Sequence, residues 1–403
     1  MSIRNPAVMP RRARGLSLIE LLVAILLSSI LVLGLVEVFA ASRTAYQLSQ
    51  GVARAQENSR FAMDFLQRDL RMIGHTGCVN DQALTMAGGG GINLHFNAAT
   101  FPLRFDVAVQ GYEATGTAPT DARTLPATPV AGAAGAWVPN LPAELTGATN
   151  PPIAGSDVVV LRFLAPIGTT LASFTPGVTA VAVPGAGGGA VASEFATSRS
   201  LFGLADCQRA SFFQATAINA TTGAVSVGPS GLNTSGLSGL ENYSGGQGVL
   251  YRAEAVAYYV GVNTAGVPAL YRRRWEAVPG VGGALDTTTE ELVEGIESLQ
   301  LLFGEDSAAV TALAPSGYIN AMSTANTIGN PIPADAAGAA ALARWRRVGA
   351  VQVGILSRSI QPSANAERPV ESLLGVALTP PADAHFRSSY ETTIALRNRM
   401  FGN

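Results

Sequence analysis

Few residues of this chain have a type and spacing that could support chemistry. The three histidines, His75, His95 and His385, do not pair at the i, i+4 spacing or form any other zinc-ligand pattern. His75 and Cys78 lie close together in the sequence, but a zinc site needs more ligands than these two. The sequence has no nucleophile-elbow motif and no phosphate-binding loop. We therefore predict no metal, no cofactor and no enzymatic activity.

Two further patterns resemble ligand-binding motifs only superficially. Residues 185–190 fit the G-x-G-x-x-A pattern of nucleotide sites, but they lack a strand–turn–helix frame and are interpreted as a flexible loop. Residues 272–274 are three arginines followed by Trp275, and could contact a phosphate backbone. The chain as a whole is slightly acidic, with a net charge of −2, so this cluster is more typical of a solvated strand end. We expect no nucleic-acid partner.

One carboxylate stands in an unusual place. Glu20 lies near the start of an apolar stretch from Leu16 to Ala41, within which Leu21 to Val36 carries no charge. As a helix this stretch would rise about 39 Å, enough to span a hydrocarbon core of about 30 Å. A charge in a membrane span is costly and by default marks a function. The alternative is that Glu20 lies at the interface and extends toward water.

Flanking charge predicts the orientation of this segment. Four arginines and no acid lie within residues 1–14, whereas only Arg43 follows closely. The positive-inside rule places the N-terminus in the cytoplasm and the chain after residue 42 outside it. An ordinary secretory signal, cleaved after Ala40, is the alternative. It is disfavoured because the apolar stretch is longer than the usual about 7–15 residues and contains a carboxylate.

Residues 15–22, Gly-Leu-Ser-Leu-Ile-Glu-Leu-Leu, resemble the processing site of type IV prepilins. In that family a prepilin peptidase cuts after the glycine, the new first residue is N-methylated, and a glutamate stands fifth in the mature chain. The resemblance implies a leader of residues 1–15, cleavage between Gly15 and Leu16, methylation of Leu16, and an assembly role for Glu20. The family usually has Phe where this chain has Leu16.

Further blocks resemble PilW-type minor pilins and are spread over most of the chain. They are Asp69–Gly74 with Gly77 and Cys78, Asp206–Ala210, Tyr258–Gly261, Leu270–Arg273, Leu292–Glu297 and Leu396–Arg399.

The two cysteines, Cys78 and Cys207, both follow the apolar segment. Because the topology places them outside the cytoplasm, we expect a disulfide between them; two buried thiols are the alternative. Such a bond, closing a loop of more than about a hundred residues, would stabilise the fold by about 2–5 kcal/mol.

The resemblance implies a minor pilin that helps initiate type IV pilus assembly in a tip or priming complex. Its partners would be the prepilin peptidase, other minor pilins, the major pilin and the inner-membrane assembly platform. The globular part would lie in the periplasm and, after assembly, on fibres used for twitching and attachment. A GspJ-like minor pseudopilin of type II secretion and a membrane-tethered adhesin are the alternatives.

The elements that must position these residues follow from periodicity. Apolar or small residues recur at helical spacing from Leu48 to Ile73, which predicts one helix over residues 16–73. Residues 16–41 would be its membrane and assembly part, and residues 42–77 an amphipathic extension. Residues 60, 64 and 68 alternate in charge on another face. Residues 78–403 predict a β-rich domain with long loops, so the fold class is α+β, pilin-like, with an antiparallel sheet packed on the helix.

The β-rich region alternates short strands with Gly-, Pro- and Ala-rich loops, which are predicted at residues 113–156, 184–193 and 219–247. Two short helices are expected, at Thr287–Val293 and Asp335–Ala343. The predicted strands are Asp157–Leu164, Val178–Val183, Ser211–Ile218, Ala253–Val262, Ala269–Trp275, Ile296–Phe303, Val348–Ser357 and Tyr390–Arg397.

Processing at the leader gives the first testable prediction. The mature chain should begin at Leu16 and carry an N-methyl group, because Gly15 and Glu20 have the prepilin spacing behind a basic leader. Mass spectrometry of the N-terminal peptide of the expressed protein measures both features. A mature chain that begins at Ala41 would contradict the prepilin interpretation and indicate ordinary secretion.

Overall fold

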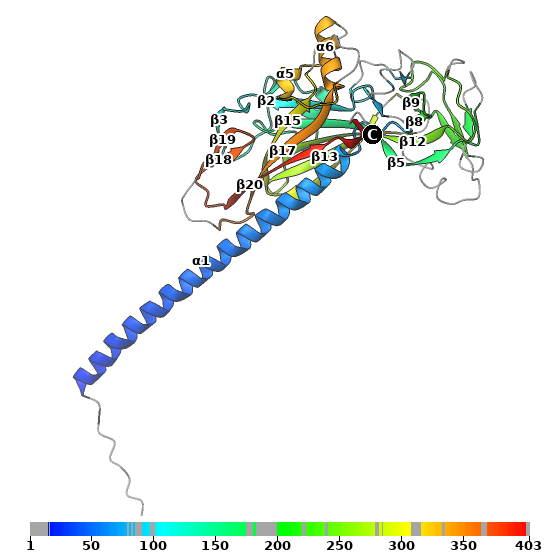
Figure 1. Ribbon diagram of the computed structural model, residues 1–403. Coiled ribbons are helices and arrows are strands. Elements are labelled where there is room, and N and C mark those ends of the chain that lie inside the picture. Colours follow the sequence, from blue (N-terminus) through cyan, green and yellow to red (C-terminus); the bar gives the residue numbers. More distant parts are fainter. Residues whose placement is uncertain are drawn as a thin grey trace, which may run out of the picture. The chain divides into compact units, whose positions relative to one another are not determined.

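The computed structural model contains two compact units, Met1–Gln50 and Gly51–Asn403 (Figure 1). The structure describes residues 15, 17–78, 80–81, 84, 91–96, 101–174, 180–182, 200–219, 223–237, 241–278, 282–283, 285–307, 316–332, 335–363 and 369–399.

The long helix α1 spans Leu18–Leu70, 53 residues, and confirms the predicted helix with slightly shorter bounds. Every described residue from Ser17 to Gln50 is exposed, whereas one face of the helix from Gly51 onward is buried. The helix is followed by a turn that includes Gly74, whose φ of +80° is a backbone conformation that suits glycine.

The largest sheet of the second unit has nine strands, ordered β1-β9-β8-β12-β5-β2-β4, with β13 between β12 and β14. All neighbours are antiparallel except β1 and β9. The central residues of β12 are buried on both faces, which explains their continuous apolar sequence. The strands are β1 (Ile92–Leu94), β2 (Val109–Ala114), β4 (Trp137–Val138), β5 (Val158–Thr170), β8 (Leu201–Ala205), β9 (Ala210–Gln214), β12 (Val249–Val262), β13 (Pro268–Ala277) and β14 (Leu285–Glu294).

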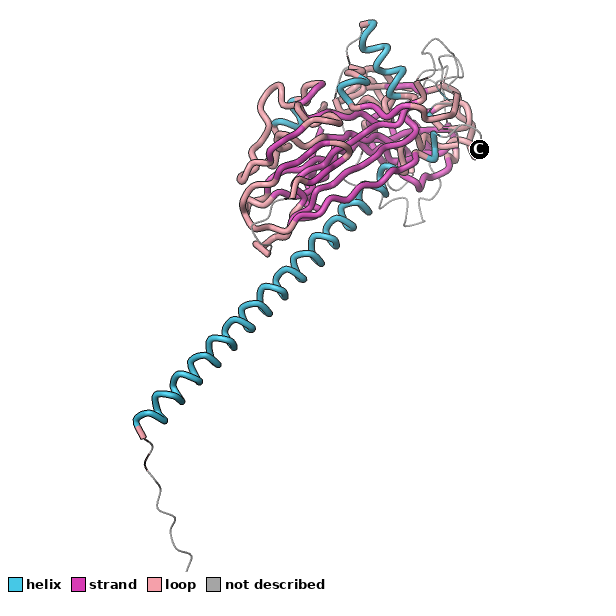
Figure 2. The backbone as a smooth tube through the Cα atoms, turned by 60° about the vertical axis from the view of Figure 1, so that its left-hand side comes forward, coloured by secondary structure: helices cyan, strands magenta, loops and turns pink. Residues whose placement is uncertain are grey.

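A second, fully antiparallel sheet has the order β16-β15-β17-β20, and two small sheets flank the large ones. Figure 2 shows the strands of this unit running side by side as a layered β structure. The second sheet comprises β16 (Ala321–Ser323), β15 (Ile296–Glu305), β17 (Val348–Arg358) and β20 (Arg387–Ala395). The small sheets comprise β10 (Ala217–Asn219), β11 (Ala224–Ser226), β7 (Ala180–Ala182) and β6 (Ser173–Phe174), and β18 (Glu371–Leu373), β19 (Val376–Thr379) and β3 (Ala122–Thr124).

The short helices test two sequence predictions. α6 (Ala336–Trp345) confirms the helix predicted at Asp335–Ala343, and the Asp335 carboxylate caps it by accepting a hydrogen bond from the backbone N–H of Gly338 at 2.7 Å. The remaining short helices are α3 (Ala143–Thr146), α5 (Ala325–Ile328) and the 3₁₀ turn η1 (Arg397–Arg399).

The helix predicted at Thr287–Val293 is wrong, because these residues belong to strand β14. Three consecutive β-branched threonines favour the strand, and β14 pairs along its whole length with β13. Long-range pairing with β13 therefore determines the structure of this segment.

The long loop predicted over residues 113–156 is only partly correct. This segment contains β3, β4 and α3, and its side chains Trp137, Leu145 and Ile153 are buried. The indole N–H of Trp137 donates to the backbone oxygen of Ser156 at 2.9 Å. A few large apolar side chains thus anchor the segment without any periodic pattern.

Two other strand and loop predictions change in detail. The strand predicted at Ser211–Ile218 is divided between β9 and β10. The predicted loop 219–247 includes β11, and the predicted loop 184–193 lies outside the described residues.

The buried carboxylate of Asp157 joins the two large sheets. Its Oδ1 accepts the backbone N–H of Ala114 at 2.8 Å, and its Oδ2 accepts that of Leu301 at 2.9 Å. Burial is the main cause that raises the pKa of Asp157 to about 7, although these two donors act in the opposite direction. Because the folded state holds the proton more tightly, this carboxyl favours folding most at low pH and less as the pH rises from about 4 to about 7.

The core that receives α1 lies between the two large sheets. Met63 and Leu66 of α1 belong to one buried apolar cluster with strand residues that include Val256 of β12 and Val353 of β17. Phe303 and Trp345 pack edge to face within the same cluster, with ring centroids 4.8 Å apart.

Gly111 of β2 should be indispensable to this core. A Cβ at Gly111 would lie 2.4 Å from the ring of Phe303, so Gly111→Ala should destabilise the fold by about 1–3 kcal/mol through overpacking. Urea unfolding of the full-length protein in detergent, followed by the fluorescence of its three buried tryptophans, measures the change. Gly282→Ala is the matched control, because nothing lies within 4 Å of that Cβ, and it should change stability by less than about 0.5 kcal/mol. Equal stability of the two variants would contradict the packing argument.

Candidate functional site

The N-terminal end of α1 carries the residues predicted to support assembly. Ser17 and Glu20 form a reciprocal capping box: the Glu20 carboxylate accepts from the Ser17 backbone N–H at 2.9 Å and from its hydroxyl at 3.0 Å, and Ser17 Oγ accepts from the Glu20 N–H at 3.3 Å. Gly15 is exposed, and Leu16 lies outside the described residues. The carboxylate predicted to be functional therefore also stabilises the start of the helix that it belongs to.

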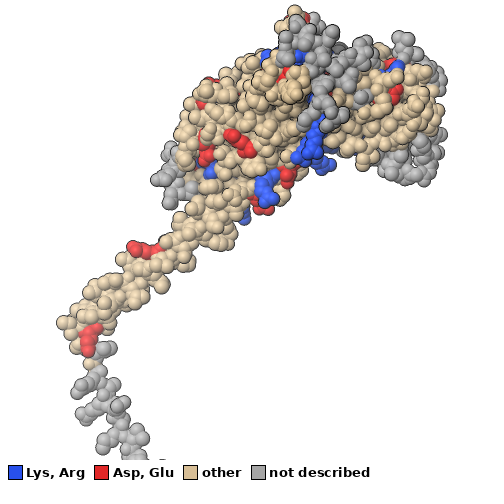
Figure 3. Space-filling view, in the orientation of Figure 1, with Lys and Arg blue, Asp and Glu red and all other residues tan. Residues whose placement is uncertain are grey.

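The first part of α1 offers an apolar surface all round. Its large apolar side chains from Leu18 to Phe39 are 50% or more exposed. In the part of the chain that the structure describes, α1 is the one helix long and apolar enough to cross a membrane. Figure 3 shows this stretch as mostly uncharged, and its two acids are Glu20 and Glu37. An all-round apolar helix is stable when lipid or other helices cover it.

In the second unit, small residues let α1 approach the strands closely. Gly51, Ala55 and Ser59 recur every four residues and are buried. The Ser59 hydroxyl lies within hydrogen-bond distance of the Ala55 carbonyl oxygen, at 3.0 Å, and of Ser357 Oγ in β17, at 2.8 Å. A Cβ at Gly51 would lie 2.1 Å from Ser363 Oγ, so this position accommodates the approach because it lacks a side chain.

A buried acid near the end of α1 is held by the large sheet. Asp69 Oδ2 accepts a hydrogen bond from the hydroxyl of Tyr258 in β12 at 2.6 Å, and Nη1 of Arg272 in β13 lies 3.7 Å from the same oxygen. Burial, and next the charge of Asp69, raise the pKa of the Tyr258 phenol above its ordinary value, so the phenol remains a hydrogen-bond donor. Arg272 is held in turn by Glu290 at 2.7 Å. This contact fixes both the position and the rotation of the helix on the sheet.

The segment after α1 is fixed by a covalent bond and a buried ion pair. Cys78 and Cys207 form a disulfide with Cα atoms 4.8 Å apart, which confirms the predicted pairing. Cys207 lies in the turn between β8 and β9 rather than within a strand. Asp81 pairs with the buried guanidinium of Arg399.

The C-terminal turn also closes over the end of the helix. The side-chain amide of Asn398 donates to the carbonyl oxygens of Arg71 and Ile73 at 3.1 and 3.3 Å. Sequence blocks that lie hundreds of residues apart thus meet at the end of α1. The sequence blocks resemble those of a known family, but their sequences do not predict that they contact one another. Polar residues next to strand-like patterns are the one local signal of such buried contacts.

The three histidines, which could have supported catalysis or metal binding, each form hydrogen bonds within the fold. His75 and His385 each have Nδ1 within hydrogen-bond distance of a backbone oxygen, at 2.9 and 2.6 Å. His95 lies between Ser235 and Glu241, at 3.0 Å from each. Among the described residues no group of three or more His, Cys, Asp or Glu is placed to hold a metal ion.

Two of the three arginines in the cluster pair with acids, and the third contacts hydroxyl groups. Arg272 pairs with Glu290, Arg274 pairs with Glu254 at 3.2 Å, and Arg273 donates to threonines of β14. The segment is thus part of a strand with locally balanced charge.

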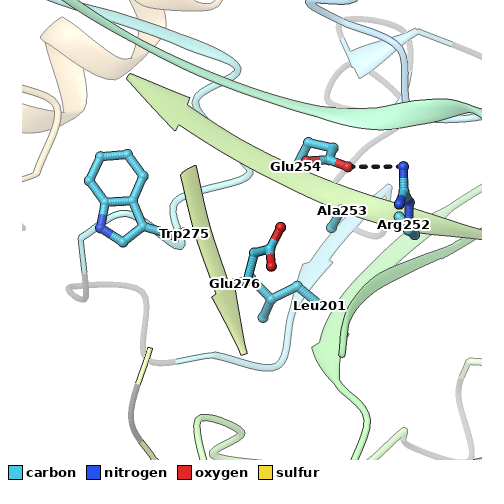
Figure 4. Close-up of a pocket in the computed structure, with 6 residues that line it drawn as sticks. All are labelled: Leu201, Arg252, Ala253, Glu254, Trp275 and Glu276. Carbon is cyan, nitrogen blue, oxygen red and sulfur yellow. Dashed lines mark ion pairs between the residues drawn. The ribbon is translucent and has the colours of Figure 1, made fainter. Parts of the chain in front are cut away.

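A small pocket lies next to Trp275, which follows the three arginines in the sequence, and Figure 4 shows the residues that line it. Its volume is about 10 Å³, close to the space that one water molecule requires, which is too small for an organic substrate. Its lining residues are Leu201, Arg252, Ala253, Glu254, Trp275 and Glu276, with Arg252 and Glu254 paired at 3.3 Å.

Residues 185–190, which superficially fit a nucleotide motif, lie outside the described residues.

Comparison with known families identifies the class of protein. The model of the prokaryotic N-terminal methylation motif matches residues 10–36, which supports a prepilin-like protein with a type IV leader. The model of the type IV pilus-assembly protein W family matches residues 257–398, about a third of the chain, which supports a PilW-type minor pilin. Both families are structural components of pili rather than enzymes. No curated protein and no solved structure matches the chain.

The Asp69 contact yields a test of how α1 is attached. Asp69→Ala should destabilise the fold by about 1–3 kcal/mol, because it leaves the buried Tyr258 hydroxyl and Arg272 without this acceptor. Asp69→Asn retains an acceptor and should lose less. Asp64→Ala, an exposed acid on the same helix, is the matched control and should change stability by less than about 0.5 kcal/mol. Urea unfolding in detergent ranks the three variants, and an Asp69→Ala protein as stable as Asp64→Ala would contradict the attachment role.

Proposed function

We propose that this PilW-type minor pilin helps initiate assembly of a type IV pilus, in a priming or tip complex with other minor pilins. The observation that carries the proposal is the placement of Glu20, an exposed carboxylate near the start of a helix whose next acid is Glu37. The implied partners are the major pilin, other minor pilins, the prepilin peptidase and the inner-membrane assembly platform.

Removal of the leader creates a positive charge that can pair with the Glu20 carboxylate. Hydrolysis of the bond between Gly15 and Leu16 converts an uncharged amide nitrogen into an amine, which is positive at neutral pH even when it is monomethylated. While the leader is attached, that nitrogen is an amide and cannot form an ion pair. Cleavage therefore precedes, and permits, the pairing of an N-terminal amine with a carboxylate.

In the assembly step, Glu20 of one subunit pairs with the N-terminal amine of a neighbour as their apolar helices pack. In the low-dielectric surroundings of packed helices an ion pair is strong, and either charge left alone is costly. The capping hydrogen bonds from Ser17 hold the carboxylate at the helix start until then. Pairing of Glu20 with the amine of its own chain is the competing arrangement, and it would order the helix start without joining subunits.

The domain organisation fits this role. Residues 1–15 serve as the leader, residues 16–41 as the membrane and assembly segment, residues 42–77 as the amphipathic extension, and residues 78–403 as a periplasmic domain. The Cys78–Cys207 disulfide supports a location outside the cytoplasm, because such bonds persist in oxidising compartments. After assembly the globular domain would be displayed on the pilus.

The match to the PilW family favours a type IV pilus over type II secretion, since it covers residues 257–398. A free-standing adhesin would need a membrane anchor but would not need Glu20 or leader removal. Loss of Glu20 should therefore impair a protein that initiates pilus assembly, but not a free-standing adhesin.

Substitution of Glu20 tests the proposal. Glu20→Ala should leave membrane insertion and the disulfide intact, but weaken association with other pilins and reduce surface pili roughly tenfold, because the neighbour's amine is left unpaired in a low-dielectric site. Crosslinking in membranes and counts of surface pili are the two readouts.

Glu37→Ala is the matched control, since Glu37 is an exposed acid of the same apolar helix, and it should retain most pili. Wild-type crosslinking and pilus counts in Glu20→Ala cells would show that Glu20 is only an interfacial charge.

A further inference from the structure

Two buried carboxyl groups face each other where β2 meets β5. The antiparallel register pairs Tyr112 with Val158, so Glu113 and Asp157 follow as the next two residues opposite each other. Both are almost completely buried, with 5% and 2% of their surface exposed. Like charges directly opposite on neighbouring strands are destabilising, and burial strengthens their repulsion. Two ionised carboxylates at this place would therefore work against the fold.

The two carboxyl groups differ in their hydrogen bonds. Asp157 accepts the backbone N–H groups of Ala114 and Leu301, which stabilise its ionised form. Glu113 Oε2 is buried and has no hydrogen-bond partner in the described part of the chain. A negative charge on such an oxygen is costly, whereas a protonated carboxyl is neutral. These contacts favour a negative charge on Asp157 and a proton on Glu113.

The groups around Glu113 act mainly in favour of its protonated form. Burial, and next the charge of Asp157, raise the pKa of the Glu113 carboxyl to about 9, and Asp121 adds to this increase. The backbone N–H of Ala325, at the start of α5, lowers the pKa but does not outweigh the other causes. Neither α5 nor β4 has a titratable side chain.

The charged side chains of the other adjoining elements have partners of their own. Glu305 pairs with Arg344, Glu297 pairs with Arg387, Arg123 donates to the backbone oxygen of Thr115, and Arg162 donates to that of Val107. A second negative charge at the pair would therefore be poorly compensated.

The pair lies near an edge of the large sheet and next to the second layer. Only the two-residue strand β4 lies beyond β2 at this edge, and β2 contacts α5 on its inward face, as a Cβ at Gly111 would lie 3.0 Å from that of Ala325. Figure 1 shows β2, α5 and β15 at the same end of the domain. We call β2, β4 and α5 the edge region. Helix α1 is attached elsewhere, through the contact of Asp69 with β12 and β13.

We propose that Glu113 and Asp157 hold a single proton between them, and that removal of this proton separates the edge region from β15 while the rest of the domain remains folded. The proton passes to hydroxide, which becomes water, and a second negative charge then replaces a neutral group in a buried site. The inference goes beyond the proposed assembly function and does not depend on it. For a domain outside the cytoplasm, as proposed above, the pH of the medium would act on this contact directly.

The raised pKa of Glu113 sets the direction of the pH effect. Between pH values of about 4.5 and about 9, the folded chain holds a proton that the unfolded chain releases. Folding stability from this group is therefore greatest at or below a pH of about 4.5 and falls as the pH rises to about 9. Within this range the group should raise the unfolding equilibrium constant by up to about tenfold per pH unit.

Glu113→Gln tests the proposal, because the amide has the size of the protonated carboxyl but cannot ionise. Urea unfolding of the full-length protein in detergent, at pH values of about 5 and about 8, measures the unfolding equilibrium constants. Between these pH values the constant of the wild type should rise at least about a hundredfold more than that of Glu113→Gln, and at the lower pH the two proteins should be nearly equal. Glu144→Gln, which removes an exposed acid between β2 and β5, is the matched control and should follow the wild type.

Infrared spectroscopy measures the proton itself. The wild-type protein at neutral pH should show the C=O stretch of a protonated carboxyl, and Glu113→Gln should lack this absorption. The measurement on the wild type does not depend on the stability of any variant.

Tryptic cleavage after Arg123 measures opening of the edge region, because Arg123 lies in the segment that joins β2 to β5. At a pH of about 9, cleavage after Arg123 should be about tenfold faster in the wild type than in Glu113→Gln, since local opening exposes this segment. Cleavage after the exposed Arg397 should be equal in the two proteins.

Four results would overturn the proposal. They are an equal pH dependence of stability in the wild type and Glu113→Gln, a wild type without protonated Glu113 at neutral pH, equal cleavage after Arg123 in both proteins, and cleavage after Arg397 that accelerates together with cleavage after Arg123. The last result would mean that the whole domain opens instead of the edge region.

Discussion

A single helix in this protein has to suit two different surroundings, and the rest of the structure depends on how it does so. The first part of α1 is apolar on every side and exposed in the structure, so it requires lipid or other helices around it. The second part buries a face of small and apolar residues between two sheets. Because both requirements fall on one continuous element, the globular unit is built around a helix that also belongs to another environment.

Because α1 belongs both to an apolar environment and to the core of the domain, its attachment to the domain is partly polar. A helix held only by apolar contacts can rotate or slide along a sheet, whereas the carboxylate of Asp69 between Tyr258 and Arg272 is directional. The strands that supply these partners lie within the region that matches the PilW family, residues 257–398. The family model therefore covers the polar attachment of the helix, whereas the apolar core around the helix also draws on β2 and β5, which lie outside that match.

Local patterns predicted much of this fold, and long-range contacts account for what they missed. The helix, the disulfide and most long strands follow from periodicity, topology and residue type, which act within a short stretch of chain. Strand β14 is not predicted from local patterns because its pairing with β13 has no local signature. The same reason applies to Asp69: nothing in its neighbourhood indicates that a tyrosine 189 residues away donates to it. At the N-terminal site, the position of Glu20 predicts its importance, and the Ser-x-x-Glu spacing of residues 17–20 is the local signal for its capping contact with Ser17.

The disulfide between Cys78 and Cys207 has a mechanical consequence. A tensile load on a protein is carried by its covalent bonds and by the non-covalent contacts that connect them, such as the hydrogen bonds between strands. Tension that enters the globular unit through α1 reaches Cys78 only a few residues after the helix ends, and there it divides between the main chain and the turn that joins β8 to β9. Because β8 pairs with β12, which also pairs with β5 and β13, part of the load enters the large sheet at an inner strand instead of an edge strand. The covalent link thus makes the domain resist extension at the end of the chain by which it is held.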